Sequence, residues 1–323
     1  MSTTTTATTA TPAITAENVT TLFPDVDPSL AQAFSRSPNG PPARDSGELE
    51  GYDEEQIRLM DEVCIVLDEN DQPIGSASKK TCHLMTNIER GLLHRAFSVF
   101  LFDSQKRLLL QQRASEKITF PDMWTNTCCS HPLGIPGETG VEFEAAVQGV
   151  RRAAQRKLDH ELGIKAEQVP LEKFDFLTRI HYKAPSDGKW AEHEIDYILF
   201  IQADVDLNVS PNEVRDTKYV TAEELKQMFQ DPELKFTPWF KLICNSMLFT
   251  GGRNSALKSS SSSRETGPFT PLKPSVAGPT DCRKLPAGSL ANQSSGSAQT
   301  RCDVSEPWSK LRSLFLSPAL WPY

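Results

Sequence analysis

Between residues 62 and 250 the chain alternates between two patterns of apolar residues, one recurring at every second position and one at every third or fourth. The period-two segments, typical of strands, cover residues 62–68, 96–103, 107–113, 174–184 and 193–205. The polar sequence SQK, residues 104–106, predicts a hairpin between the second and third of them, and PSDGK, residues 185–189, predicts a turn between the last two. ENDQPIG, residues 69–75, predicts a further turn.

Three segments have the periodicity of helices. In residues 141–163 the apolar residues fall at intervals of three or four, and Gly163 supplies a stop. Residues 221–229 begin with a capping box from Thr221 to Glu224, and residues 237–249 begin with Thr237 as cap and Pro238 at the first helical position. Because strands and helices interleave, the sequence predicts one domain of the mixed α/β class, with a sheet flanked by helices.

Composition sets the limits of this domain. Residues 1–50 are rich in Thr, Ala, Ser and Pro and lack apolar periodicity, so we expect them to be disordered. Residues 251–323 are rich in Ser, Pro and Gly up to a short apolar ending, and we expect this low-complexity extension to be disordered as well. The remaining residues, 51–250, are enough for one well-buried domain.

Charge and cysteine content exclude several classes of protein. A net charge of −8 disfavours a nucleic-acid partner, since phosphate backbones are bound by clustered Lys and Arg. The N-terminus resembles neither a signal peptide nor a mitochondrial presequence, and no run of about 18 apolar residues predicts a membrane span. Seven cysteines without a secretory signal indicate reduced thiols and a cytoplasmic location. The sequence does not determine the oligomeric state, and a monomer is the default expectation.

A set of imidazoles and carboxylates is the first candidate site. Cys129 and His131 are two residues apart in TNTCCSHPL, and two glutamates share that spacing in WAEHEID, so each pair places its side chains on one face of an extended chain. The full set, His83, His94, His131, Glu192 and Glu194, suits a divalent ion such as Mg²⁺, Mn²⁺ or Zn²⁺. Taken singly, each residue also has an ordinary structural interpretation: a surface histidine, a solvent-facing glutamate or a core cysteine.

Basic residues form a second candidate group. Lys79, Arg113 and Lys117 are interpreted either as a clamp for a diphosphate anion or as a solvated rim, and Lys80 beside Lys79 leaves that choice open.

The end of the long helix carries a further pattern. RKLDHELG, residues 156–163, resembles the end of a Nudix box, R-E-x-x-E-E-x-G, but places Lys157 and His160 where glutamates are expected. Hydrolysis is disfavoured by this loss of Mg²⁺ ligands, while a single Mg²⁺ held by Glu161 on a substrate diphosphate remains open.

Taken together, these motifs resemble the type I isopentenyl-diphosphate Δ-isomerases of the Nudix superfamily, over residues 61–249. The resemblance implies a Nudix-like mixed sheet, a prenyl diphosphate as small-molecule substrate, and proton transfers by Cys129 and Glu194 with Tyr182 beside them. It also implies one divalent ion in the His/Glu set and a second Mg²⁺ placed by Glu161 with the diphosphate. By the same resemblance Lys79, Arg113, Lys117 and Ser130 contact the diphosphate, and Trp239 lines the pocket.

Two alternatives remain at this point. One is a Nudix-type diphosphohydrolase on the same fold. The other is a non-catalytic prenyl-diphosphate binding protein, because the likeness to the isomerases ends at Phe249, where TGGRNSALKSSSSS begins.

Overall fold

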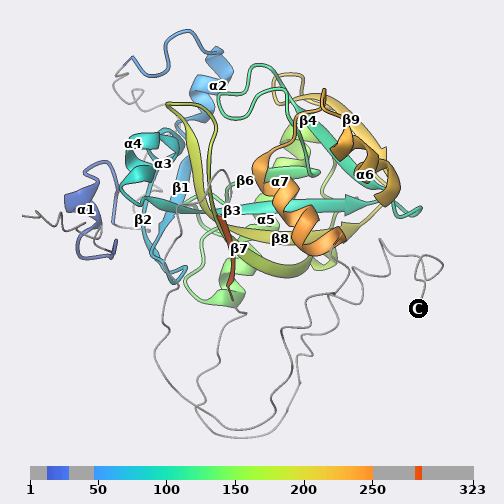
Figure 1. Ribbon diagram of the computed structural model, residues 1–323. Helices are drawn as coiled ribbons and strands as arrows, with labels where there is room; N and C mark the ends of the chain where they lie inside the picture. Colours follow the sequence, from blue (N-terminus) through green and yellow to red (C-terminus); the bar gives the residue numbers. More distant parts are fainter. Residues whose placement is uncertain (1–12, 29–46, 250–280, 286–323) are drawn as a thin grey trace, which may run out of the picture.

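A mixed β-sheet forms the centre of the computed structural model (Figure 1), which describes residues 13–28, 47–249 and 281–285. The main order of the strands is β10-β7-β8-β3-β1-β2. Strand β3 runs parallel to β8, in register from His94 opposite Glu194 to Phe102 opposite Gln202, and the other strand pairs are antiparallel. The mixed α/β fold class expected from the sequence is confirmed.

The helices and strands follow one another along the chain with short connections. The strands are β1 (Val63–Leu67), β2 (Pro73–Ser78), β3 (Leu93–Phe102), β4 (Leu108–Arg113), β5 (Trp124–Thr125), β6 (Cys128–Ser130), β7 (Asp175–Pro185), β8 (Ala191–Gln202), β9 (Val214–Val220) and β10 (Asp281–Leu285). The helices are α1 (Val19–Leu22), α2 (Glu54–Leu59), α3 (Lys79–His83), α4 (Met85–Glu89), α5 (Phe143–Leu162), α6 (Ala222–Gln230) and α7 (Pro238–Ile243), with a 3-10 turn at Leu171–Lys173 and a π-helical turn at Cys244–Phe249.

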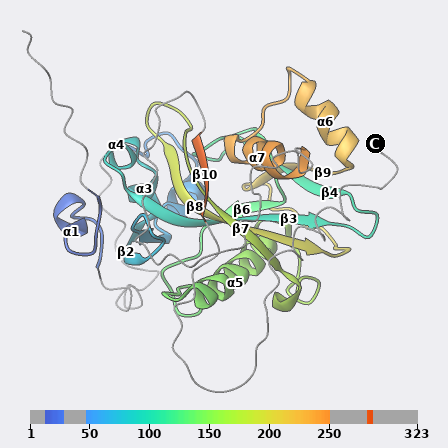
Figure 2. The same cartoon turned by 60° about the horizontal axis from the view of Figure 1, so that its bottom comes forward.

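Helices cover both faces of the sheet (Figure 2). Strand β8 shows why, because its alternate residues enter two separate apolar clusters. Ile195 and Tyr197 pack with α5, whereas Ile198 and Phe200 pack with α6 and α7. This two-sided burial accounts for the nearly continuous apolar sequence of the strand.

Helix α5 forms as the sequence predicts. Its apolar positions, including Val150, Leu158 and Leu162, are fully buried against the sheet. Gly163 ends the helix in the left-handed region with φ 68°, and a Cβ there would lie 2.4 Å from the backbone oxygen of Asn208. Glycine therefore serves both as the helix stop and as the point where the 208 region approaches the helix end.

One local prediction was wrong in its bounds, and two were right only in part. The expected turn at residues 69–75 is shorter, because residues from Pro73 onward form β2. The predicted hairpin of β3 and β4 is present, but it has a single residue pair, Phe102 with Leu108, since β4 turns away to pair with β5 and β9. Thr237 is the N-cap residue of α7 and is followed by Pro238, as predicted, but its side chain makes no capping hydrogen bond. The hydroxyl instead lies 2.8 Å from that of Thr125. The capping box at Thr221 and Glu224 is confirmed.

Part of the N-terminal region expected to be disordered is folded. Residues 13–28 include α1 and pack on β1 and β2, where Val19, Phe23 and Val26 are buried. Asp27 and Ser76 exchange two backbone hydrogen bonds of 2.8 Å. Gly75 permits this approach, since a Cβ there would lie 2.7 Å from the Asp27 oxygen. Sparse apolar residues without regular spacing were therefore sufficient to dock this segment.

The C-terminal extension is described only at residues 281–285. These form β10 and pair with β7, so the expectation of disorder was wrong for this stretch as well. Residues 1–12, 29–46, 250–280 and 286–323, on which the remaining predictions of disorder fall, lie outside the described residues. Among the helices that are described, none has the length and apolar content required to span a bilayer.

Candidate active site

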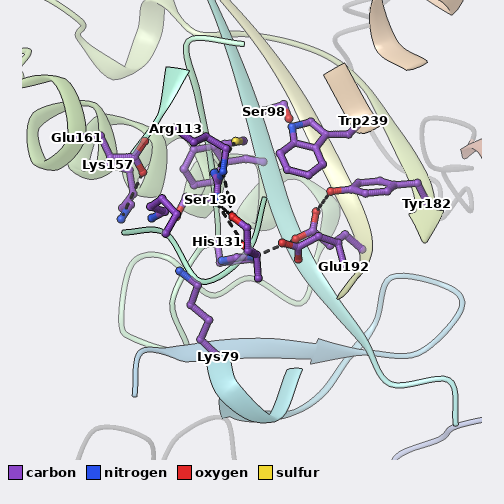
Figure 3. A pocket seen from close by; sticks show the side chains of 15 residues that line it. Lys79, Ser98, Arg113, Ser130, His131, Lys157, Glu161, Tyr182, Glu192 and Trp239 are labelled. Carbon is purple, nitrogen blue, oxygen red and sulfur yellow. Dashed lines mark hydrogen bonds and ion pairs between the residues drawn. The ribbon is translucent and has the colours of Figure 1, made fainter. Parts of the chain in front are cut away.

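A cleft lies where strands β3, β6 and β8 meet helices α3, α5 and α7 (Figure 3). Most of the residues singled out in the sequence line it: Lys79, Arg113, Lys117, Cys129, Ser130, His131, Glu161, Tyr182, Glu192, Glu194 and Trp239. The two remaining candidates, His83 and His94, lie close to the cleft residues His131, Glu192 and Glu194. The fold therefore gathers residues that are up to 160 positions apart, from Lys79 to Trp239, around one cavity.

Three histidines and two glutamates converge at one end of the cleft. The ring centroids of His83, His94 and His131 lie 4.7–5.0 Å apart. Each of the five residues offers a ligand atom, and these atoms all lie within 4.8 Å of one another. The register of β3 and β8 causes part of this convergence, because His94 lies directly opposite Glu194.

The protonation and hydrogen bonding of this cluster suit a divalent cation. His83 Nδ1 lies 2.6 Å from the Lys79 carbonyl, which can only accept, so the Nε2 lone pair is directed to the cluster. Burial lowers the pKa of His94 and, further, that of His131, which keeps both rings neutral. Burial alone would raise the pKa of Glu194, but His94 and Tyr182 hold it below its ordinary value, so this carboxylate is ionised.

Several polar atoms of the cluster have no hydrogen-bond partner among the described residues. They are His83 Nε2, both ring nitrogens of His94, His131 Nδ1 and Glu192 Oε2. His83 Nε2 and Glu192 Oε2 are 2.8 Å apart but lack the directional geometry of a hydrogen bond. Buried polar atoms are normally satisfied. The orphaned His83 Nε2 and His94 Nε2 lie 2.8 and 3.9 Å from the orphaned Glu192 Oε2, so these three atoms fit ligands of a bound metal ion.

Cys129 and Cys128 face opposite sides of the sheet. Cys129, on β6, lines the cleft, with its sulfur 3.8 Å from Arg113 Nη1 and 3.9 Å from Thr125 Oγ1. Cys128 packs among the core residues on the α5 side, 3.5 Å from Glu161 Oε2. Strand alternation thus separates a cleft thiol from a core thiol. Burial raises the pKa of Cys129 to about 12, and the nearby Arg113 opposes this.

Glu194 and two aromatic residues form the opposite wall. The Tyr182 hydroxyl donates to Glu194 Oε2, while Glu194 Oε1 lies 2.9 Å from His131 Nε2 and 3.2 Å from His94 Nε2. Burial raises the pKa of Tyr182, so the phenol keeps its proton. Trp239 is 3% exposed, and its ring lies 6.0 Å from that of Tyr182 and edge-on to Phe120 at 5.0 Å.

The basic residues at the other end of the cleft are not a solvated rim. Arg113 and Lys117 are 7% and 8% exposed. Arg113 donates from Nε to the Phe120 carbonyl and from Nη2 to the Thr119 carbonyl, which leaves Nη1 on the cleft side near Cys129. The ammonium of Lys117 donates to Glu213 at 2.7 Å. Some N–H groups of these two residues therefore bond to protein atoms, and the others remain for an anion in the cleft. They differ in this from a clamp in which every N–H group is available to the anion.

Two further charged residues at this end of the cleft were not expected from the sequence. Lys157 lines the cleft from α5 at 1% exposure, 3.4 Å from Glu161. Its place in the altered Nudix pattern was a usable signal, since a cation stands where a metal ligand was expected. Glu213, immediately before β9, is 2% exposed and had no local signal. Glu161 also accepts a hydrogen bond from Gln111 at 3.1 Å.

The sheet, the α5 helix and the cleft at its C-terminal end define a NUDIX-domain protein, and the NUDIX domain model matches residues 92–240. The chain is 78% identical over 255 residues to the isopentenyl-diphosphate delta-isomerase of Aspergillus fumigatus, with 76% of this chain and 91% of that protein covered. It is 70% identical over 250 residues to that of Gibberella zeae, with coverages of 77% and 92%. The isomerase 1 of Bos taurus is 58% identical over 200 residues, with coverages of 61% and 87%. The chain belongs to the isopentenyl-diphosphate delta-isomerase family.

Proposed function

We propose that this protein interconverts isopentenyl diphosphate and dimethylallyl diphosphate by an allylic proton shift. The observation that carries the proposal is the buried cleft itself, which has a thiol on β6 and a carboxylate on β8 beside a metal-ligand cluster at one end, and cations at the other. This division matches a small substrate with a five-carbon olefin and a diphosphate.

The chemistry requires an acid and a base on either side of the olefin. A proton is added at the terminal methylene of isopentenyl diphosphate, which produces a tertiary cation-like state, and another is removed from the neighbouring methylene carbon. Water would capture that cation. The low exposure of Trp239 and Tyr182 supports a site that excludes solvent, and the Trp239 ring face can stabilise the positive charge.

Glu194 is our candidate for proton delivery to the double bond, and Cys129 is our candidate for accepting the departing proton. Tyr182 can pass a proton to or from Glu194, since its hydroxyl donates to that carboxylate. The pKa of Cys129, raised to about 12, and the lowered pKa of Glu194 place the proton on the thiol. These are the protonation states in which the reverse reaction begins, with Cys129 as the acid and Glu194 as the base.

A divalent metal would bind to the five-residue cluster of His83, His94, His131, Glu192 and Glu194 and, when bound, would neutralise and orient the Glu194 carboxylate. The ion would be Mg²⁺, Mn²⁺ or Zn²⁺. For the diphosphate, Lys79, Arg113, Lys117, Lys157 and Ser130 are the proposed contacts, and Glu161 is the proposed ligand of a second Mg²⁺. Hydrolysis of the diphosphate is not favoured, because α5 offers Lys157 and His160 in place of carboxylates.

We also propose the cytosol as the compartment. Five cysteines, Cys64, Cys82, Cys128, Cys129 and Cys244, are free thiols, as expected in a reducing environment.

Deuterium incorporation tests the function directly. The purified protein would be incubated with Mg²⁺ and isopentenyl diphosphate in D₂O, and NMR would follow deuterium in the methyl group of the product. We expect incorporation by the native protein and its loss in Cys129→Ala and Glu194→Gln. Cys128→Ala is the matched control and should keep most of the activity, because its side chain faces the core. Full activity in Cys129→Ala would contradict the proposed role of the thiol.

A further inference from the structure

Glu213 is a buried carboxylate behind the cationic end of the cleft, and the proposed mechanism does not use it. It lies in the turn before β9 and is 2% exposed. Its Oε2 accepts a hydrogen bond from Lys117 at 2.7 Å and lies 4.0 Å from Lys157 Nζ. The two lysines come from different elements, the loop after β4 and helix α5, and both line the cleft. One oxygen atom therefore links two cations of the proposed diphosphate site.

The second oxygen of Glu213 is also held. Gln56, on α2, is 3% exposed and donates to Glu213 Oε1 at 2.8 Å. Gln56 contacts Asn212 as well, and Asn212 in turn donates to Asp53, the cap of α2. Each oxygen of the carboxylate thus has its own partner. The Glu213 carboxylate is therefore held from outside the cleft through Gln56, which does not line the cavity.

We propose that Glu213 is a positioning residue for diphosphate binding: it holds the Lys117 and Lys157 ammonium groups together at the cleft wall. This inference rests on the proposed function. An ammonium group has three N–H donors, so a lysine that donates one of them to Glu213 still has others for a phosphate oxygen. Glu213 therefore fixes the direction of the two lysines without competing with the ligand for every donor.

The charges around Lys117 explain why it needs this partner. Burial lowers the pKa of Lys117 to about 8, Glu213 opposes that shift, and Lys79, Arg113 and Lys157 add to it. Glu62, before β1, is a further carboxylate that faces the same lysines. Without Glu213 the remaining influences favour the neutral amine, so Lys117 would lose its proton at a lower pH. A neutral amine forms only a weak contact with a diphosphate.

Glu213→Gln tests the inference, since it keeps the shape of the side chain and removes its charge. Binding of inorganic pyrophosphate to the intact protein with Mg²⁺ would be measured by calorimetry at about pH 6.5 and about pH 8.5, on either side of the Lys117 pKa. We expect about ten- to a hundredfold weaker binding at the higher pH, the equivalent of one charge-assisted hydrogen bond, and a smaller loss at the lower pH. In the isomerase assay KM should rise, while kcat should stay within about threefold.

Two further variants separate positioning from net charge. Glu62→Gln removes a carboxylate near the same lysines that makes no ion pair with them in the described part of the chain, and it should change binding by less than about threefold. Glu213→Asp keeps the charge on a shorter side chain, so its affinity for pyrophosphate should lie between those of the native protein and Glu213→Gln. This variant also provides a test if Glu213→Gln does not fold.

Three results would overturn the inference. The first is that Glu213→Gln binds pyrophosphate as tightly as the native protein at both pH values. The second is an equal loss of pyrophosphate affinity in Glu62→Gln and Glu213→Gln, and the third is that the native protein does not bind pyrophosphate. A native protein that binds pyrophosphate but incorporates no deuterium would instead refute the isomerase function and leave the role of Glu213 standing.

Discussion

Replacement of Trp239 tests whether the cleft stabilises a cation. The indole lies at the start of α7, is 3% exposed, and is held between Phe120 and Tyr182 at centroid distances of 5.0 and 6.0 Å. Its N–H donates to Asn126 at 3.3 Å, a long hydrogen bond. The ring face is therefore positioned mainly by its aromatic neighbours and only weakly by its polar atom.

Two substitutions separate the ring face from the N–H group. Trp239→Leu removes the face, and a desolvated cation–π interaction is worth about 2 kcal/mol. If that energy applies to the transition state alone, kcat falls about 30-fold while KM changes little. Trp239→Phe keeps a face and loses the hydrogen bond to Asn126, worth at most about 1 kcal/mol, so its kcat should fall less than about fivefold.

Steady-state kinetics and thermal unfolding would be measured on the same preparations. Phe240→Leu is the control, because Phe240 is the next residue of α7, is fully buried against Phe100 and Phe229, and does not line the cleft. It should lower stability and leave kcat unchanged. A folded Trp239→Leu protein with kcat within about threefold of the native value would refute the reasoning, and so would equal losses in the Leu and Phe variants.

The remaining predictions concern stability, docking and metal binding. Asp71→Asn should lower the free energy of unfolding by about 3–5 kcal/mol in urea, because the Asp71 carboxylate is buried between Arg95 and Arg179, and a loss below about 1 kcal/mol would contradict this. Gly75→Ala should displace residues 13–28, since its Cβ would lie 2.7 Å from the Asp27 oxygen, and should speed proteolysis there; Gly188→Ala, with open space around it, should not. Removal of bound metal by a chelator should lower the unfolding temperature. Mn²⁺ or Zn²⁺ at about 100 times the Kd should then raise the free energy of unfolding by about 2.7 kcal/mol in the native protein but not in His83→Ala. Equal recovery in both proteins would remove His83 from the ligand set.

The sequence predicted an element well where the element's own apolar residues mark its burial. Helix α5 and strand β8 are examples, since α5 buries one stripe and β8 is covered on both faces. Prediction failed where a neighbour distant in sequence decides the structure. Strand β2, PIGSAS, has little apolar character of its own and is ordered by pairing with β1 and with Asp27. Residues 13–28 are ordered by a surface that the local sequence does not reveal.

The candidate site, like the fold, was predictable from the sequence only in part. Residue types and family likeness selected the ligands of the His/Glu cluster, and the parallel register of β3 and β8 brings His94 and Glu194 together. The direction of Arg113 was beyond the sequence, because it depends on backbone carbonyls in the 119–120 turn. The pairing of Lys117 with Glu213 links residues 96 positions apart and has no signature in either segment.

Lys157 offers a physical reason for a proton shift rather than hydrolysis on this fold. A NUDIX hydrolase activates water with Mg²⁺ held by carboxylates of the helix that corresponds to α5. Here that helix presents an ammonium group at 1% exposure. Burial opposes its charge, but Glu161 and Glu213 raise the pKa of Lys157 above its ordinary value, so it stays a cation. A fixed cation attracts the diphosphate and disfavours metal ions beyond the single Mg²⁺ proposed at Glu161. In the proposed mechanism the anion is then held without an activated water, while the thiol and the carboxylate at the other end of the cleft act on the olefin.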